Sequence, residues 1–267
     1  MKRALPRMVL VPLSLLVICC STVPITGRKQ FTIIPESQMV SMADQQYTEF
    51  MKANPKSTNQ AQTRMVRNVG ERLRAAVERY MAEQKRSEAL KNYRWEFNLV
   101  ESKDVNAWAM PGGKIVFYTG ILPLTRDEIG IAVVMGHEIA HVIARHGNER
   151  MTQALVAQMG GMALAQALKN RPEQTQKLWL GAFGLGAQVG LLLPYSRLHE
   201  KEADRLGMIF MAMAGYNPDA AVEFWGRMAE MNKGGAMPEF LSTHPSDATR
   251  IRLLKEALPE ARGYYRP

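Results

Sequence analysis

The stretch that decides the fold is Thr125-Arg-Asp-Glu128-Ile-Gly-Ile-Ala-Val-Val-Met-Gly136-His-Glu-Ile-Ala-His-Val-Ile143. Its residues from position 129 onward are mostly apolar, which predicts a buried helix. Thr125 and Glu128 have the spacing of a capping box, so we expect the helix to begin there and to end at Gly147. Gly136 costs about 1 kcal/mol relative to Ala inside a helix, and this predicts that another segment packs closely against it.

Within this helix, His137 and His141 lie one turn apart and Glu138 lies beside them. Positions i and i+4 share a helix face and lie about 6 Å apart, so both imidazoles can direct a nitrogen at one cation. Neutral imidazole suits zinc, and the neighbouring carboxylate can take a proton from a zinc-activated water. The motif therefore predicts hydrolytic zinc chemistry, and a metallopeptidase first of all.

A third ligand is expected from the stretch 196–204, which reads Ser-Arg-Leu-His-Glu-Lys-Glu-Ala-Asp. Glu200 and Asp204 share one helix face, so Glu200 can bind the metal while Asp204 accepts the outward N–H of a ligand imidazole. The alternative is that these acidic residues form the solvated face of a mixed-charge helix. Glu202 is expected to point away from both, and His199 to be structural or exposed.

Two separated motifs, taken together, resemble a family. His137-Glu138-x-x-His141 with Ser196-Arg197 and Glu200-x-x-Ala203-Asp204 is similar to the zinc metallopeptidases that include HtpX, the CAAX prenyl proteases and the periplasmic proteins BepA and LoiP, and closest to the LoiP-like lipoproteins. Further matches are Asn106-Ala107-Trp108-Ala109-x-Pro111-Gly112-Gly113 and Ser242-Thr243-His244-Pro245 with Arg250. The resemblance covers residues 21 to about 254.

The resemblance implies one zinc ion per chain and assigns a role to each matching residue. The implied zinc ligands are His137, His141 and Glu200, with Glu138 as general base and acid and Asp204 supporting a ligand from outside the metal shell. The position of His244 implies either stabilisation of the oxyanion or a latency-imposing bond to zinc, and both remain open. Because a donor to a developing oxyanion contributes about 3 kcal/mol, the first role predicts that His244→Ala lowers turnover far more than zinc content.

The N-terminus indicates where the protein acts. Basic residues precede an uncharged apolar run from 8 to 18 that ends at Cys19-Cys20. This is the shape of a signal peptide, and the run is too short to cross a hydrocarbon core of about 30 Å. We expect a lipoprotein signal over residues 1–19, an acylated Cys20 (Cys19 being the alternative), and a lipidated linker over 20–35. The predicted location is the bacterial cell envelope, at the periplasmic face of the outer membrane.

The composition limits which covalent links, domain organisation and binding partners are possible. Both cysteines of the 267-residue chain lie in the signal segment, so the mature protein can form neither an internal disulfide nor a cysteine zinc site. The apolar content of 46% suffices for one domain over 36–267. The net charge of +9 favours anionic lipid or acidic protein surfaces over nucleic acid, because no basic run is interleaved with aromatic residues. The oligomeric state is not legible.

The remaining pattern predicts a mainly helical fold with a small antiparallel sheet, an α+β zincin of gluzincin type. Helices are expected over 37–52, 58–89, 197–214, 218–231 and 245–257. Alternation over 94–100 and a Pro-Gly-Gly turn between 105–110 and 114–119 predict strands and a hairpin. Its edge residues Asn106, Ala107, Trp108 and Ala109 are expected to bind an extended substrate by strand addition.

The stretch 150–194 allows two interpretations. Its halves, 151–168 and 178–194, are rich in Ala, Gly, Met and Leu, and the second is of borderline length for a membrane span. Charged residues between the halves favour a helical hairpin that forms a lid over the active site.

The expected function is a zinc endopeptidase that hydrolyses unfolded or misassembled proteins of the cell envelope. This substrate class follows from the resemblance and from the predicted location. One alternative is an assembly factor or chaperone for outer-membrane proteins with latent protease activity. Another is a metal-free structural lipoprotein, which zinc analysis would distinguish.

Overall fold

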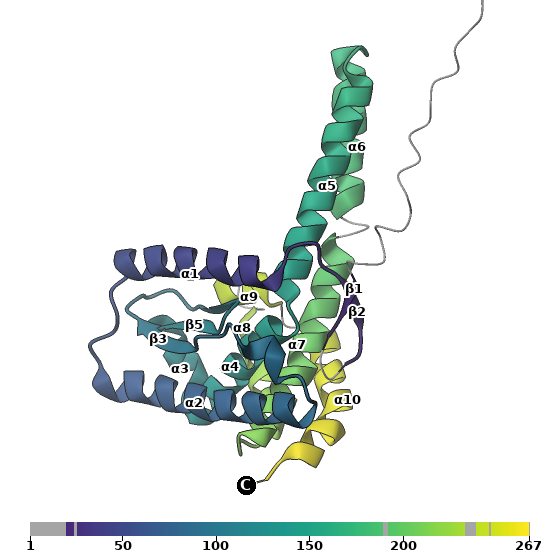
Figure 1. The fold of residues 1–267 in the computed structure, drawn as a ribbon. Helices are drawn as coiled ribbons and strands as arrows, with labels where there is room; N and C mark the ends of the chain where they lie inside the picture. Colours follow the sequence, from purple (N-terminus) through teal and green to yellow (C-terminus); the bar gives the residue numbers. More distant parts are fainter. Residues whose placement is uncertain (1–19, 24–25, 189–191, 233–238, 246, 267) are drawn as a thin grey trace, which may run out of the picture.

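A computed structural model describes residues 20–23, 26–188, 192–232, 239–245 and 247–266. Helices make up most of this part, and two small sheets complete it (Figure 1). This confirms the predicted fold class. The predicted signal peptide lies outside the described residues.

Helices occur along the whole described chain, whereas the strands are confined to its first half. The helices are α1 Glu36–Ala53, α2 Gln60–Glu83, α3 Leu122–Thr125, α4 Glu128–Ile143, α5 His146–Leu168, α6 Glu173–Ala187, α7 Leu193–Met213, α8 Asp219–Asn232, α9 Glu239–Thr243 and α10 Ala248–Tyr264. The strands are β1 Cys20–Thr22, β2 Lys29–Phe31, β3 Glu96–Val100, β4 Ala107–Met110 and β5 Lys114–Tyr118.

Helix α4 is the buried helix that the opening stretch predicts, since every residue from Gly130 to Ile143 is buried. The predicted capping box is wrong, because the side chain of Asp127 caps the helix by accepting the N–H of Gly130 at 2.9 Å. A carboxylate at the N-cap satisfies an otherwise free N–H as well as a threonine hydroxyl does. Thr125 instead ends the short helix α3.

The predicted stop at Gly147 is also wrong. Helix α4 ends at Ile143, and Arg145 takes a left-handed conformation with φ of 58° that redirects the chain into α5. Gly147 therefore lies in the first turn of α5 rather than at the end of α4.

The close packing predicted at Gly136 is confirmed. A Cβ atom on Gly136 would lie 2.9 Å from the carbonyl oxygen of Gly207 on α7, and a Cβ on Gly207 would lie 2.8 Å from the backbone nitrogen of His137. The two backbones can touch only because both residues lack a side chain. This crossing brings the acidic face of α7 against the histidines of α4.

The larger sheet has the strand order β3-β5-β4. The predicted hairpin is confirmed, with β4 antiparallel to β5, but β3 pairs parallel to β5, so the sheet is mixed rather than antiparallel. Strand β5 takes the centre because its residues Lys114 to Phe117 are all buried, and such a strand needs neighbours on both sides. Strand β4 is consequently an edge strand, as predicted.

The described residues of the segment 20–35, which was predicted as a linker, fold onto the domain. Strands β1 and β2 pair antiparallel, and the segment bonds to the base of α5. Thr152 accepts the N–H of Ile33 at 3.2 Å, and the amide of Asn148 donates to the carbonyl of Ile34 at 2.7 Å.

Helices α5 and α6 form the predicted hairpin, which extends away from the rest of the described structure (Figure 1). This differs from the predicted lid, because α5 leaves α4 at Arg145 and buries only residues of its first two turns. No helix in the described part of the chain is long and apolar enough to cross a membrane. The hairpin carries several exposed apolar side chains, namely Leu155, Val156, Met159, Met162, Leu178, Trp179 and Leu185.

Candidate metal centre

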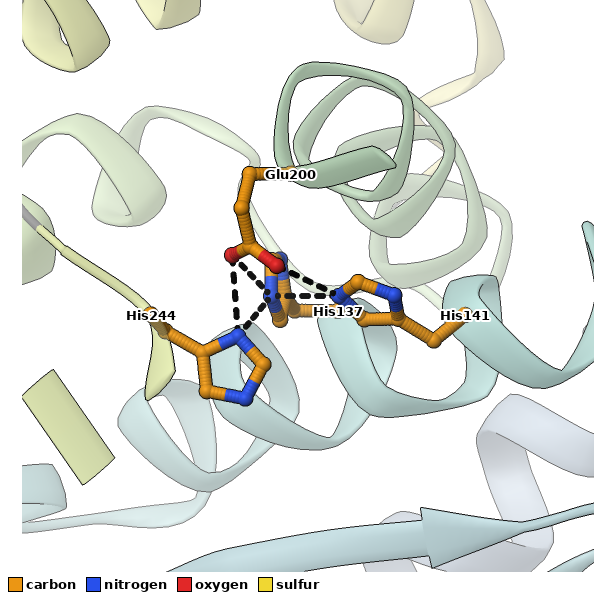
Figure 2. Close-up of side chains that lie close together, drawn as sticks. All are labelled: His137, His141, Glu200 and His244. Carbon is orange, nitrogen blue, oxygen red and sulfur yellow. Dashed lines mark hydrogen bonds and ion pairs between the residues drawn. The ribbon is translucent and has the colours of Figure 1, made fainter. Parts of the chain in front are cut away.

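Four side chains converge between α4, α7 and the residue that follows α9 (Figure 2). We call His137, His141, Glu200 and His244 the metal centre. The Nε2 atom of His137 lies 3.1 Å from Nε2 of His141 and 3.1 Å from Nδ1 of His244. The carboxylate of Glu200 lies 3.3 Å from Nε2 of His137, 3.3 Å from Nε2 of His141 and 2.8 Å from Nδ1 of His244.

These distances suit zinc. Zinc binds imidazole nitrogen at 2.0–2.1 Å, so neighbouring ligand atoms of a tetrahedral site are separated by about 3.3 Å. The measured separations of 2.8 to 3.3 Å are close to that value. Three imidazole nitrogens and one carboxylate oxygen also match the chemical preference of zinc.

The proton positions around the two α4 histidines call for a cation. Nδ1 of His137 lies 2.9 Å from Asp204 and donates to it, and Nδ1 of His141 lies 2.9 Å from Nδ1 of His146. When both Nδ1 atoms carry the proton, both Nε2 atoms present lone pairs to each other. They repel unless positive charge lies between them. The pKa of His137 is lowered by burial but raised more by Asp204 and Glu200, to about 9, which reflects the same demand.

Asp204 lies beside His137, where its carboxylate can fix the tautomer of that ligand. The guanidinium of Arg250 donates to both oxygens of Asp204 at 2.7 and 2.8 Å. Burial would raise the pKa of Asp204, but Arg250 and His137 lower it below its usual value. Arg250 also donates to the carbonyl of His244 at 3.2 Å and lies 3.3 Å from the centre of the Trp225 ring. This positioning role of Arg250 was missed at the level of sequence.

Glu138 is buried next to the metal centre. Its Oε1 atom lies 3.3 Å from Nε2 of His244 and has no hydrogen-bond partner among the described residues. Burial raises the pKa of Glu138, and Glu200 adds to this effect. A buried carboxylate oxygen that makes no hydrogen bond is rare in proteins, and here it is suited to accept a proton from a water at the centre.

His244 contributes its Nδ1 atom to the metal centre. Of the two roles that the sequence left open, this arrangement corresponds to the zinc ligand. It fills the fourth corner, which a catalytic zinc site otherwise leaves to water.

Of the predicted substrate-binding residues, Ala107, Trp108 and Ala109 lie on β4 beside α4, and Asn106 directly precedes this strand. Trp108 packs against Phe50 of α1, with ring centres 4.9 Å apart. The chain just before this strand is bonded to α9, because the N–H of Phe240 donates to the carbonyl of Val105 at 3.1 Å. A hydrogen bond therefore links the segment that leads into the edge strand to the helix before His244.

A buried polar group next to His141 was not anticipated. His199 is buried rather than exposed, and with His146, Glu149 and Glu202 it forms a set of hydrogen-bonded side chains. The sequence contains this group as two His-x-x-Glu pairs, one on each of two helices. A single pair of this kind cannot be distinguished from the residues of an ordinary helix surface.

Comparison with known proteins agrees with this geometry. The family model "Peptidase family M48" matches residues 69–258. Over 176 residues, which are 64% of this chain and 49% of the relative, the chain is 39% identical to the mitochondrial metalloendopeptidase OMA1 of Schizosaccharomyces pombe. It is 27% identical to metalloendopeptidase OMA1 of Bos taurus over 243 residues, which are 89% of this chain and 46% of that protein.

A bacterial relative carries a different name. The putative beta-barrel assembly-enhancing protease of Vibrio cholerae is 32% identical over 162 residues, covering 58% of this chain and 33% of the relative. The chain thus spans about half of the length of the mitochondrial relatives it matches and less of the bacterial one. With His137, His141, Glu200 and His244 placed to hold a metal ion, the chain belongs to peptidase family M48.

Proposed function

We propose that this protein is a zinc metalloendopeptidase that hydrolyses unfolded or misassembled proteins of the bacterial cell envelope. The observation that carries the catalytic part of the proposal is the buried Oε1 atom of Glu138, which lies 3.3 Å from His244 and makes no hydrogen bond to any described residue. The substrate class rests on the free edge of β4 and the exposed α5–α6 hairpin, and the location rests on the N-terminal sequence.

The chemistry follows from the positions of the side chains. Bound zinc would lower the pKa of a water to about 7 and polarise the scissile carbonyl. Glu138 would accept a proton from that water as its oxygen bonds to the scissile carbonyl carbon, and would then pass this proton to the amine that leaves when the C–N bond breaks. The raised pKa of Glu138, caused by burial, suits both halves of this transfer. Asp204, held by Arg250, keeps the ring of His137 in one tautomer throughout.

The free edge of β4 supports the proposal that the substrates are unfolded proteins. This strand pairs only with β5 among the described strands, so its other edge offers backbone N–H and C=O groups to an incoming strand. An extended segment of sufficient length is available mainly in unfolded chains and long loops. The exposed apolar side chains of the α5–α6 hairpin add a surface that suits the apolar stretches of such chains.

The position of His244 supports a resting state in which the metal centre is closed to an attacking water. If Nδ1 of His244 is the fourth zinc ligand, an attacking water would have no place at the metal until the ring withdraws. Substrate that binds along β4 can displace His244, because Val105, two residues before β4, accepts a hydrogen bond from Phe240 on the helix that precedes His244. The same observation favours the second candidate function, an assembly factor for outer-membrane proteins in which proteolysis is latent.

The envelope location is supported by the N-terminal sequence and by the names of two bacterial relatives. An apolar run that ends at Cys19-Cys20 is typical of lipoproteins, and lipid on Cys20 would place the protein at the periplasmic face of the outer membrane, as in the LoiP-like members. Two matched relatives are named as beta-barrel assembly-enhancing proteases. Radiolabelled palmitate should label the wild-type chain in bacterial cells and not the Cys20→Ser variant. Equal labelling of both would contradict lipidation at Cys20.

The substrate class is tested with one protein in two states. An outer-membrane β-barrel protein, either denatured and diluted or refolded in detergent, is incubated with the zinc-loaded enzyme, and cleavage sites are identified by mass spectrometry. We expect cleavage of the denatured form at least about tenfold faster. Equal rates on both forms would contradict the proposal. Improved refolding without cleavage would transfer support to the assembly factor.

A further inference from the structure

Beside the metal centre, two identical sequence pairs cross-link two helices. His146 and Glu149 on α5 have the same spacing as His199 and Glu202 on α7. His146 bonds to Glu202 at 3.0 Å, and His199 bonds to Glu149 at 2.9 Å, so each histidine pairs with the glutamate of the other helix. The two rings stack with centres 4.2 Å apart, and all four residues are buried.

This group is connected to the zinc ligand His141. The Nδ1 atoms of His141 and His146 lie 2.9 Å apart. Because Nε2 of His141 faces the metal centre, its Nδ1 carries the proton and donates to His146. His146 then carries its own proton on Nε2 and donates it to Glu202. Each step fixes the tautomer of the next ring.

An arginine from the N-terminal segment holds the two glutamates. Arg28 donates to both oxygens of Glu149 at 3.0 and 2.7 Å, and its Nε donates to Glu202 at 2.8 Å. The hydroxyl of Thr26 donates to the second oxygen of Glu202. Two buried carboxylates this close repel each other without a cation between them, so Arg28 is what keeps Glu202 in place. We call Arg28 with Glu149 and Glu202 the Arg28 clamp.

The other zinc histidine has a comparable support. His137 donates to Asp204, which Arg250 holds with two hydrogen bonds. In both cases an arginine fixes a carboxylate that sets the direction of a ligand imidazole. The arrangement at His141 is longer by one imidazole, that of His146.

We propose that Arg28 and His146 are positioning residues for the zinc ligand His141, so that the N-terminal segment 20–35 completes the metal site. The proposal rests on the zinc site of the proposed function, and it adds that zinc affinity depends on the docking of a segment distant in sequence. Arg28 lies 121 and 174 positions from its two partners, Glu149 and Glu202. Loss of this docking loosens His141 without removing any ligand.

The experiment measures zinc affinity of the purified full chain by competition with a chromogenic chelator. Removal of a partner outside the metal shell typically lowers metal affinity about 10- to 100-fold, so we expect that range for His146→Ala and about tenfold for Arg28→Ala. The double variant decides the mechanism. Because both residues act through one series of contacts, its loss should equal that of His146→Ala alone.

Arg262→Ala is the matched control. Arg262 also donates two hydrogen bonds to one carboxylate, that of Asp219, at 3.1 and 2.6 Å, but this pair joins α10 to α8 outside the His141 network. Its removal should therefore leave zinc affinity within about twofold of the wild type. Thermal unfolding of each metal-free variant reports whether it is folded, and Arg28→Gln replaces Arg28→Ala if the latter does not fold.

Two results would overturn the proposal. One is zinc affinity of both the Arg28 and the His146 variants within about twofold of the wild type. The other is a fold-loss of zinc affinity in the double variant that equals the product of the two single fold-losses. This would mean that Arg28 and His146 act independently, as expected if Arg28 is purely structural. Tight zinc binding by every variant would contradict this inference alone. A wild-type chain that binds no zinc would contradict the metallopeptidase function as well.

Discussion

Two carboxylates at the metal centre have opposite tasks because their surroundings differ. Asp204 is held ionised by Arg250, and its lowered pKa keeps it as a fixed acceptor for His137. The Oε1 atom of Glu138 lacks a hydrogen-bond partner among the described residues, and burial raises the pKa of this side chain. The first is suited to orient a ligand, and the second is suited to move a proton.

His244 is the residue whose replacement distinguishes a latch from a catalyst. As the fourth ligand it blocks the water position, so His244→Ala should raise the basal rate of casein cleavage severalfold while weakening zinc binding about tenfold. Rates at matched zinc occupancy, beside the exposed neighbour variant Ser242→Ala, test this. A rate about 100-fold below wild type with zinc retained would instead assign oxyanion stabilisation to His244.

Glu149 should make stability depend on pH. Burial alone would raise its pKa, but hydrogen bonds from His199 and Arg28 lower it below 4.5. A lowered pKa in the folded state contributes stability that is complete above the unfolded value and is lost as the pH falls through the folded value. We expect Glu149→Gln to lower the free energy of unfolding by about 2 kcal/mol at pH 7.

The difference between the wild type and Glu149→Gln should shrink as the pH is lowered from 5 toward 3, when measured by urea unfolding of the zinc-free proteins. Lys29→Ala, at an exposed position next to Arg28, serves as the control. A difference that is the same at pH 7 and pH 3 would rule out an ionised Glu149 as the cause.

At the level of residues, the sequence predicted the parts of the site that short spacing encodes. The intervals His137 to His141 and Glu200 to Asp204 each span one helical turn and could be interpreted without coordinates. The Arg28 clamp could not, because its partners lie 121 and 174 positions away and no local pattern links them.

At the level of elements, the crossing of α4 and α7 aligns the site. Gly207→Ala would place a Cβ atom 2.8 Å from the backbone nitrogen of His137, and backbone cannot move aside cheaply. We expect a loss of about 1–3 kcal/mol in the free energy of unfolding, together with weaker zinc binding because α7 carries Glu200. The measurement is thermal unfolding with and without zinc.

Gly226→Ala on α8 is the control for this substitution. A Cβ atom there meets nothing within 4 Å, so Ala should stabilise the helix by up to about 1 kcal/mol. Equal behaviour of the Gly207 and Gly226 variants would show that the α4–α7 contact is not constrained as described.

Prediction of elements succeeded where periodicity is strong and was incomplete where the choice depends on tertiary packing. The buried helix and the hairpin of β4 and β5 follow from apolar runs and a Pro-Gly-Gly turn. The parallel pairing of β3 with β5 depends on which strand is buried at the centre, and that is decided by the helices around it. Asp127 caps α4 in place of the predicted Thr125 because Thr125 belongs to the short helix α3, where its hydroxyl donates to the carbonyl of Leu122.

At the level of the whole molecule, the α5–α6 hairpin extends away from the body with apolar side chains in solvent (Figure 1). Leu178 and Trp179 are 70% and 56% exposed and bury little surface on folding. The double change Leu178→Ser with Trp179→Ser should alter the free energy of unfolding by less than about 0.5 kcal/mol. If the hairpin contacts substrate, the KM for unfolded casein should rise while kcat is retained.

Met42→Ser, which replaces an exposed methionine of α1 on the surface of the body, is the control for the hairpin variant. An unchanged KM in the hairpin variant would remove the hairpin from the substrate-binding surface. A large loss of stability would show that the hairpin packs on the domain in solution.

The central claim is that zinc held by His137, His141 and Glu200 works with Glu138 to cleave polypeptides. The most direct measurement is degradation of unfolded casein by the wild type and by Glu138→Gln at equal, measured zinc content. We predict cleavage by the wild type, and equal zinc binding without cleavage by the variant, because an amide cannot accept the proton. Cleavage by Glu138→Gln at the wild-type rate would contradict the claim.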